Sequence, residues 1–210
     1  MIFISCLEIV LSYHWAMTKK LPAEYKFVEL TNDEYQKFWN EWGPKVFLDD
    51  STTVDIRSLL CEEERAHLKK LNQNTANLIR INLGIFKGDQ FCGWFSGDQY
   101  NYETFYMRNS AILPQFRRQG LYTALMNEVL ERTSALGFQV VLSRHATTNN
   151  AIIIPKLKAG FMITAIEVSE RFGTIVHLSY FFNDTRKEIM KFRAGERKPD
   201  AQLKTALGIT

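Results

Sequence analysis

Apolar residues recur along this chain with two different spacings, and the change from one spacing to the other divides it into strands and helices. Alternation of apolar and polar residues, or a short apolar run, predicts seven strands, over Tyr25–Leu30, Leu78–Phe86, Phe91–Ser96, Tyr102–Leu113, Gln139–Ser143, Phe161–Val168 and Thr174–Phe182. Helical spacing predicts four helices, from Thr31 to Gly43–Pro44 and over Asp55–Asn72, Gly120–Leu136 and Asn149–Ala159. The order β-α-α-β-β-β-α-β-α-β-β starts as antiparallel strands and passes into β-α-β. We therefore expect an α/β (α+β) fold with one mixed, mostly antiparallel central sheet flanked by helices.

Short local signals indicate where these elements begin, end and turn. Thr31 and Glu34 are spaced as a capping box at the start of the first helix, and Gly43–Pro44 is expected to end it. Gly88–Asp89 predicts a hairpin, and Arg171–Gly173 predicts a turn between the last two strands. Buried faces are predicted on three helices, formed by Phe38, Trp39 and Trp42, by Leu59, Leu60, Ala66, Leu68 and Leu71, and by Leu121, Ala124, Leu125, Val129 and Leu136.

Length and composition are those of one globular domain, which we expect to span residues 19–182. The chain has 210 residues, enough to bury a full core. Its hydrophobic fraction of 46% and net charge of +3 exclude disorder as the main state. The ordinary proportion of charged residues, 23%, also excludes a multi-pass membrane protein.

Residues 1–18 form an apolar N-terminal extension that we treat separately. Ile2–Leu11 is too short to span a bilayer. It is neither preceded by positive charge nor followed by a small-residue cleavage site, as a signal peptide would be. Three interpretations stay open: a strand or helix added to the domain, a true translation start at Met17, or a membrane anchor.

Residues 183–210 form a basic C-terminal tail. It contains seven basic and four acidic residues, and the difference equals the net charge of the whole chain, +3. Ile189 and Phe192 predict a short helix, and Gly195–Pro199 predicts a break followed by a loose end. We expect a solvated tail rather than a contact with nucleic acid.

The three cysteines, Cys6, Cys61 and Cys92, share no metal-ligand spacing and form no disulfide framework. We therefore expect free thiols in a reducing cytoplasm and no metal site.

The segment that carries chemistry runs from strand to turn to helix over Ala111–Tyr122. The first turn of a helix presents free N–H groups and the positive end of the helix dipole, which together favour a phosphate group. Gly120 would let a phosphate approach the backbone closely, and Arg117 and Arg118 add positive charge. The chain contains neither the nucleoside-triphosphate loop Gly-x4-Gly-Lys-Ser/Thr nor the dinucleotide fingerprint Gly-x-Gly-x-x-Gly.

This segment resembles motif A of the GCN5-related N-acetyltransferases, the GNAT family. That motif is Arg or Gln, two residues, Gly, one residue, then Gly or Ala, and Arg117 and Gly120 match it. Tyr122 departs from the final small residue, so the loop is expected to be tighter or the helix start shifted. Asn149, eleven residues before Gly160–Phe161, matches a second family feature. The predicted order of elements is also that of the family.

The resemblance implies acetyl-CoA, or another acyl-CoA, as co-substrate. Backbone groups of Ile112 and Leu113 would pair with the pantetheine arm, and Asn149 would either contact the cofactor or cap its helix. Backbone N–H groups would hold the pyrophosphate, from Arg117, Arg118, Gln119, Gly120, Leu121, Tyr122 and Thr123.

Acetyl transfer to an amine needs a base, because a protonated amine has no lone pair with which to attack the thioester. The candidates are Tyr106, Glu103, on the opposite face of the same strand, and His145, which has a suitable ordinary pKa. Each of them also has a purely structural interpretation. In many relatives a tyrosine four residues before the matching glycine protonates the leaving thiolate. This chain has Lys156 at that position, directly after Pro155. Lys156 either donates the proton, if burial lowers its pKa, or is a solvated lysine on a helix face.

Two classes of function remain. The first is an N-acetyltransferase that transfers an acetyl group directly from acetyl-CoA to a primary amine of a small molecule or a protein. The second is a catalytically degenerate GNAT-fold module that binds acyl-CoA or another protein. We expect neither nucleic acid nor a membrane as partner, and a homodimer is left open. The sequence does not indicate which amine is the acceptor.

Overall fold

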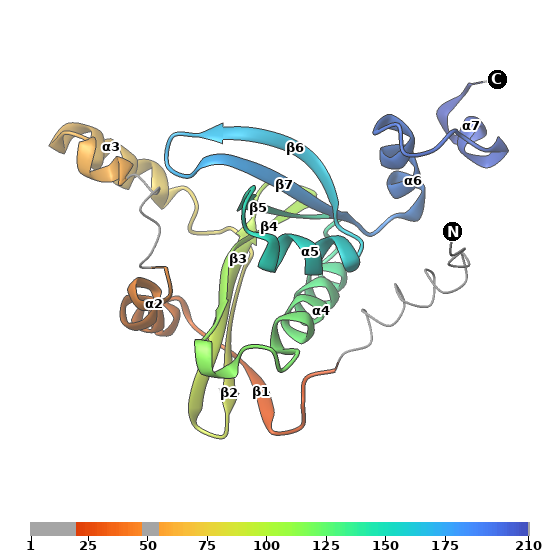
Figure 1. The fold of residues 1–210 in the computed structure, drawn as a ribbon. Coiled ribbons are helices and arrows are strands. Elements are labelled where there is room, and N and C mark those ends of the chain that lie inside the picture. The colour runs from red at the N-terminus through yellow and green to blue at the C-terminus, as the bar shows by residue number, and fades with distance from the viewer. Residues whose placement is uncertain (1–19, 48–54, 210) are drawn as a thin grey trace.

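The structure, a computed structural model, describes residues 20–47 and 55–209 (Figure 1). Seven strands form one sheet: β1 (Tyr25–Glu29), β2 (Arg80–Lys87), β3 (Gln90–Gln99), β4 (Thr104–Ile112), β5 (Val140–Ala146), β6 (Met162–Ser169) and β7 (Gly173–Phe181). Their order across the sheet is β1-β2-β3-β4-β5-β7-β6. Every neighbouring pair is antiparallel except β4 and β5, which are parallel. The predicted fold class and order of elements are confirmed. The predicted extension 1–18 and Met17 lie outside the described residues.

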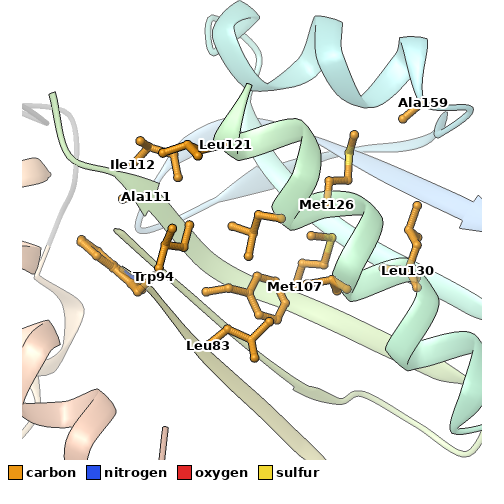
Figure 2. Packing of buried hydrophobic residues seen from close by; sticks show 14 of the residues in the cluster. Leu83, Trp94, Met107, Ala111, Ile112, Leu121, Met126, Leu130 and Ala159 are labelled. Carbon is orange, nitrogen blue, oxygen red and sulfur yellow. The ribbon is translucent and has the colours of Figure 1, made fainter. Parts of the chain in front are cut away.

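Some helices cover the two faces of the sheet, and others stand away from it (Figure 1). They are α2 (Asn32–Val46), α3 (Glu62–Gln73), α4 (Leu121–Ala135), α5 (Asn150–Lys158), α6 (Asp184–Arg193) and α7 (Ala201–Leu207), with short 3-10 turns at Ile56–Leu59 and Pro114–Phe116. Figure 1 shows α2 on one side of the sheet and α4 and α5 on the other. Figure 2 shows part of the buried core, with Leu121, Met126 and Leu130 on α4 and Leu83 and Met107 on the strands.

The sheet opens between its two parallel strands. β4 pairs with β5 only over Thr104–Met107, and the last pair is Met107 with Ser143. β4 also contains a bulge, because the register against β3 shifts between Ser96 and Gly97. Beyond Met107 the ends of β4 and β5 diverge, so main-chain groups on that side of β4 are free of the ladder.

Two predicted helices differ from the structure. The first does not end at Gly43–Pro44: α2 continues to Val46, and the Phe47 N–H bonds to the Gly43 carbonyl, so the helix closes one turn later. Its predicted capping box is confirmed. The predicted helix over 55–72 is a 3-10 turn followed by α3, and no residue of either is buried. Leu59 is 72% exposed, because this part of the chain stands away from the sheet, so its predicted inward face is wrong (Figure 1).

The predicted face of α4 is confirmed for all its residues except Leu136. Leu136 is half-exposed because the helix ends at Ala135 and Leu136 is its C-cap. The remaining predicted members, from Leu121 to Val129, are buried against the sheet.

The tail beyond β7 is more ordered than predicted. The expected loose end is instead a second helix, α7, whose first turn is capped by the Asp200 side chain and whose Leu203 is buried. Arg197 forms ion pairs with Glu188 of α6 and with Asp200, and these pairs fix the turn between the two helices. The predicted break at Gly195–Pro199 is that turn.

Candidate active site

A cleft of about 1090 Å³ occupies the opening between β4 and β5. Its walls are the diverging ends of these strands, the first turn of α4, one side of α5, the end of α2 and the turn between β6 and β7. We call it the central cleft. It brings together the predicted basic loop, Asn149, Lys156, Tyr106 and His145.

One end of the central cleft is formed by the loop before α4 and by the first turn of that helix. Gly120 is the N-cap of α4, has φ of 82° and provides no side-chain cap. The N–H groups of the first helical turn after it are therefore not satisfied within the helix. Arg118 also has a positive φ of 62°, so the backbone adopts a left-handed conformation just before the helix begins. Arg117 Nε donates to the Ile112 carbonyl at 3.0 Å, and this bond holds the loop against β4.

Gln119 and Tyr122 support the same loop. The Tyr25 hydroxyl donates to Gln119 Oε1, which connects the loop to β1. α4 begins at Leu121, directly after Gly120. Burial raises the pKa of Tyr122 above its ordinary value, against a smaller opposing effect of the Ser110 side chain. The tyrosine that departs from the motif is thus a protonated phenol packed toward β4.

Backbone hydrogen bonds correct one predicted cofactor contact. The Leu113 N–H donates to the Cys92 carbonyl and the Leu113 carbonyl accepts from the Phe116 N–H, so both main-chain groups of Leu113 already have a partner within the protein. Since hydrogen-bonding direction alternates along an antiparallel strand, Ser110 and Ile112 direct their main-chain groups toward β5. Ser110 and Ile112 thus border the opening, and Leu113 does not.

Asn149 lines the central cleft, and its side chain makes no hydrogen bond that caps α5. It is the N-cap of α5, but it makes no side-chain cap bond. Only its main-chain carbonyl serves the helix, accepting from Ile153 at 3.0 Å. The capping interpretation of this side chain is therefore wrong, and contact with a ligand is the interpretation that remains.

The two faces of the sheet separate the remaining candidates. Side chains alternate between faces along a strand. Met107 points to the face that carries α5, because its sulfur contacts Lys156 of that helix. His145 lies on the same face, where the charge of Lys156 acts on it. Tyr106 and Arg144 point to the other face, the one that carries α2, and the Arg144 guanidinium lies 5.4 Å from the centre of the Tyr106 ring.

Lys156 is buried at the base of the opening. It is 1% exposed, its Nζ lies 3.0 Å from the Met107 sulfur, and it stands 4.5 Å from the centre of the Phe161 ring. Burial without a carboxylate partner lowers the pKa of Lys156 to about 7. The interpretation of Lys156 as a solvated surface lysine is therefore wrong. α5 continues through Pro155, so the proline does not end the helix before the lysine.

His145 and Tyr106 are poor bases in this setting. Burial, with the nearby positive charge of Lys156, lowers the pKa of His145 to about 3. The ring is therefore neutral near pH 7 and holds a proton only weakly; its Nε2 lies 3.2 Å from Ser143 Oγ. Burial raises the pKa of Tyr106, so its phenol is protonated.

Glu103 lies outside the central cleft. It precedes β4, which begins at Thr104, so it does not project from the opposite face of that strand as predicted. Its carboxylate pairs with Arg186 of α6 at 2.9 Å. This contact ties the tail to the sheet at the end of β4 that lies away from the opening.

Three polar residues of the site were not singled out in the sequence. Arg144 on β5, Glu167 on β6 and His177 on β7 meet on the α2 face. The Glu167 carboxylate lies 2.5 Å from His177 Nε2 and 3.8 Å from Arg144 Nη1, and Glu167 and Arg144 line the central cleft. The residues come from three strands and share no local motif, so only the sheet register brings them together.

Within residues 20–47 and 55–209, no group of three or more His, Cys, Asp or Glu side chains could hold a metal ion. No helix in these ranges is long and apolar enough to span a bilayer. Within the same ranges, Cys61 and Cys92 are free thiols, exposed and buried respectively.

Comparison with known proteins identifies the fold. Residues 24–161 match the sequence profile of the Acetyltransferase (GNAT) family. A single-residue variant of spermidine N-acetyltransferase from Vibrio cholerae has a TM-score of 0.55 at 12% identity, covering 76% of this chain and 94% of its own. The enzyme from Escherichia coli that acetylates an alanine of a ribosomal protein has a TM-score of 0.51 at 14% identity, with the same two coverages. A GNAT acetyltransferase from Elizabethkingia anophelis, solved with acetyl-CoA, has a TM-score of 0.51 at 12% identity, covering 76% and 99%. No curated protein sequence matches the chain.

Proposed function

Because the chain belongs to the GNAT family of acetyltransferases, we propose that it transfers the acetyl group of acetyl-CoA to a primary amine. The observation that carries this proposal is the position of Lys156. This buried lysine lines the central cleft, and the N-terminus of α4, which has no side-chain cap, lines the same cleft. The two features lie along one cleft that is open to both faces of the sheet. We propose that the helix N-terminus binds an anion and that Lys156 donates a proton.

The residues present fit acetyl-CoA. The N–H groups from Arg118 to Thr123 would hold the pyrophosphate at the start of α4, whereas the predicted Arg117 N–H already donates to the Pro114 carbonyl. Main-chain groups of Ser110 and Ile112 would pair with the pantetheine arm, and the uncommitted Asn149 side chain would contact it from α5. Acetyl-CoA supplies the activated acetyl group.

Lys156 is the proposed acid, and Glu167 is the proposed base. Lys156 lies on the face that also carries α4, where the cofactor enters, and a pKa near 7 lets it donate a proton at neutral pH. Glu167 lies on the α2 face, where the acceptor would approach. Tyr106, with its protonated phenol, would act there as a hydrogen-bond donor, and neutral His145 would pack beside Lys156.

In the proposed transfer, Glu167 accepts a proton from the acceptor and Lys156 donates a proton to the leaving sulfur. An acceptor that arrives as an ammonium ion loses a proton to Glu167, and its nitrogen then forms a bond to the acetyl carbon. The carbon–sulfur bond breaks, and the sulfur takes a proton from Lys156. The nitrogen loses its second proton, Lys156 and Glu167 exchange protons with water, and one proton is released in each turnover. The products are an acetylated amine and a free thiol.

A thiol-release assay with acetyl-CoA and a panel of amines tests this function. We expect thiol release that depends on the amine and that saturates with it. A chain that binds acetyl-CoA but releases no thiol with any amine would instead be the degenerate binding module. We further propose that residues 19–182 form the catalytic domain, and that 1–18 and 183–210 are additions to it.

A further inference from the structure

Arg144 lines the central cleft, and one of its donors is unsatisfied. Its Nη2 donates to the Tyr100 hydroxyl at 3.2 Å, and its Nη1 lies 3.8 Å from the Glu167 carboxylate. Its Nε is buried and has no hydrogen-bond partner among the described residues. A buried N–H of a guanidinium is costly to leave unpaired, so this edge of Arg144 is suited to an oxygen ligand.

A second arginine, Arg108, also contacts the Tyr106 ring. The guanidinium groups of Arg108 and Arg144 both lie 5.4 Å from the centre of that ring. Arg108 is fixed by Asp98, whose side chain is 3% exposed and whose carboxylate also pairs with Arg80. The α2 face of the opening therefore carries positive charge held in place by buried contacts.

The charges that line the central cleft are strongly unequal. Away from the pyrophosphate loop, Arg108, Arg144 and Arg171 line it, and Glu167 is its only carboxylate among the described residues. A polyamine carries several ammonium groups and needs several carboxylates, so this lining disfavours one. One carboxylate beside a free guanidinium edge favours a ligand with one positive and one negative group.

We propose that the acceptor is an amino acid, a primary amine that carries a carboxylate close to its nitrogen. The carboxylate pairs with the free edge of Arg144, and the amine lies toward Glu167. The 3.8 Å between Arg144 and Glu167 places the two subsites side by side, as the short zwitterion of an amino acid requires. This inference rests on the proposed acetyl transfer and specifies its acceptor.

The test compares acceptors that differ only in the carboxylate. Thiol release is measured with phenylalanine, its amide and 2-phenylethylamine, with alanine and ethylamine as a smaller pair, and with spermidine. We expect kcat/KM for the free amino acid to exceed that of its carboxylate-free partner by about 10- to 100-fold, the effect of hydrogen bonds to a charged group. Spermidine should be the poorest acceptor.

Matched variants locate the effect at Arg144. Arg144→Gln should lower kcat/KM for the amino acids about 10- to 100-fold more than it lowers kcat/KM for the carboxylate-free amines, whose loss reports only the effect on Glu167. Arg144→Lys should recover part of the loss, because it restores the charge but not the planar pair of donors. Arg193→Gln, at an exposed site in the tail, is the control and should change neither value. Calorimetry with acetyl-CoA checks that each variant is folded.

Each outcome has a separate meaning. Equal turnover of amines with and without the carboxylate, or preference for spermidine, overturns the amino-acid acceptor while acetyl transfer stands. An equal loss for both kinds of acceptor in Arg144→Gln also overturns it. Thiol release with none of the acceptors overturns the proposed function itself, and the inference falls with it.

Discussion

Lys156 Nζ lies 3.0 Å from the sulfur of Met107, and Met107 is the last residue of β4 that pairs with β5. The lysine therefore marks the point where the two parallel strands separate. It reaches this point from α5, with its side chain buried and its ammonium group facing a thioether rather than a carboxylate. The position and the low pKa of Lys156 have the same cause, which is enclosure between α5 and the sheet.

The first prediction concerns the role of Lys156 in turnover. Lys156→Met keeps an unbranched apolar stem but removes the proton, and it should lower kcat about 10²–10⁴-fold, the usual contribution of a general acid. Affinity for acetyl-CoA should change little, and the alkaline limb of the pH–rate profile should disappear. Lys158→Met, at an exposed position of the same helix, is the matched control. If Lys156→Met retains a kcat within about threefold of the unchanged chain, the lysine is structural.

The second prediction concerns stability and pH. The folded-state pKa of Lys156 is about 7 and the ordinary value is 10.5, so the unfolded chain binds more protons between these values. Stability should therefore rise with pH across that window, and below it the folded chain bears the full penalty of a buried charge. Lys156→Met should stabilise the protein by roughly a few kcal/mol below pH 7, since one pKa unit is about 1.4 kcal/mol. Urea unfolding at several pH values measures this, and a gain that does not shrink toward pH 10.5 contradicts the assigned burial.

The third prediction concerns the anion site. Gly120→Glu places a carboxylate where the pyrophosphate is proposed to bind, and it should abolish acetyl-CoA binding in calorimetry. Gly120→Ala introduces the same strain at φ of 82° without the charge, and it should weaken binding less. Equal affinity in the two folded variants would mean that the loop does not hold the pyrophosphate.

The fourth prediction concerns Glu167. Glu167→Gln keeps the size of the side chain but removes the proton acceptor, and kcat/KM for the amine should fall about 10²–10⁴-fold. Acetyl-CoA affinity should be unchanged, because Glu167 lies on the acceptor face. Glu170→Gln, an exposed glutamate three residues further along the chain, is the control. If Glu167→Gln retains full activity, another residue is the base.

The fifth prediction concerns the N-terminal extension. A chain that begins at Met17 retains β1 and everything after it, so it should be soluble and bind acetyl-CoA with unchanged affinity. Comparison of the two chains by calorimetry measures this. Precipitation of the shorter chain alone would make residues 1–16 part of the domain.

The sequence is sufficient to predict what depends on local spacing. The strands, the hairpin at Gly88 and the capping box at Thr31 follow from periodicity and turn chemistry, and all are present. Periodicity indicates that a helix has an apolar side, but it does not indicate what covers that side. Leu59, Leu68 and Leu71 therefore satisfy the pattern yet remain exposed among the residues that the structure describes.

The parts of the site that lie in one short stretch of sequence were predictable. The parts that strand pairing brings together were not. The loop at Gly120 and the position of Lys156 come from short spacings. The exclusion of Leu113 depends on its pairing with Cys92, and the meeting of Arg144 with Glu167 depends on two strand registers. No contiguous motif contains these contacts, because each joins residues that are far apart in the chain, and a register shift of one residue would turn every side chain to the opposite face.

Direct transfer of an acetyl group to an amine fixes the stoichiometry of the two products. The chain is incubated with acetyl-CoA and phenylalanine, and the free thiol and the acetylated amine are quantified together, the latter by mass spectrometry. We expect one acetylated amine for each thiol released, with both rates lowered about 10²–10⁴-fold in Lys156→Met. Thiol release without acetylated amine, or binding of acetyl-CoA with neither product from any amine tested, would exclude direct transfer.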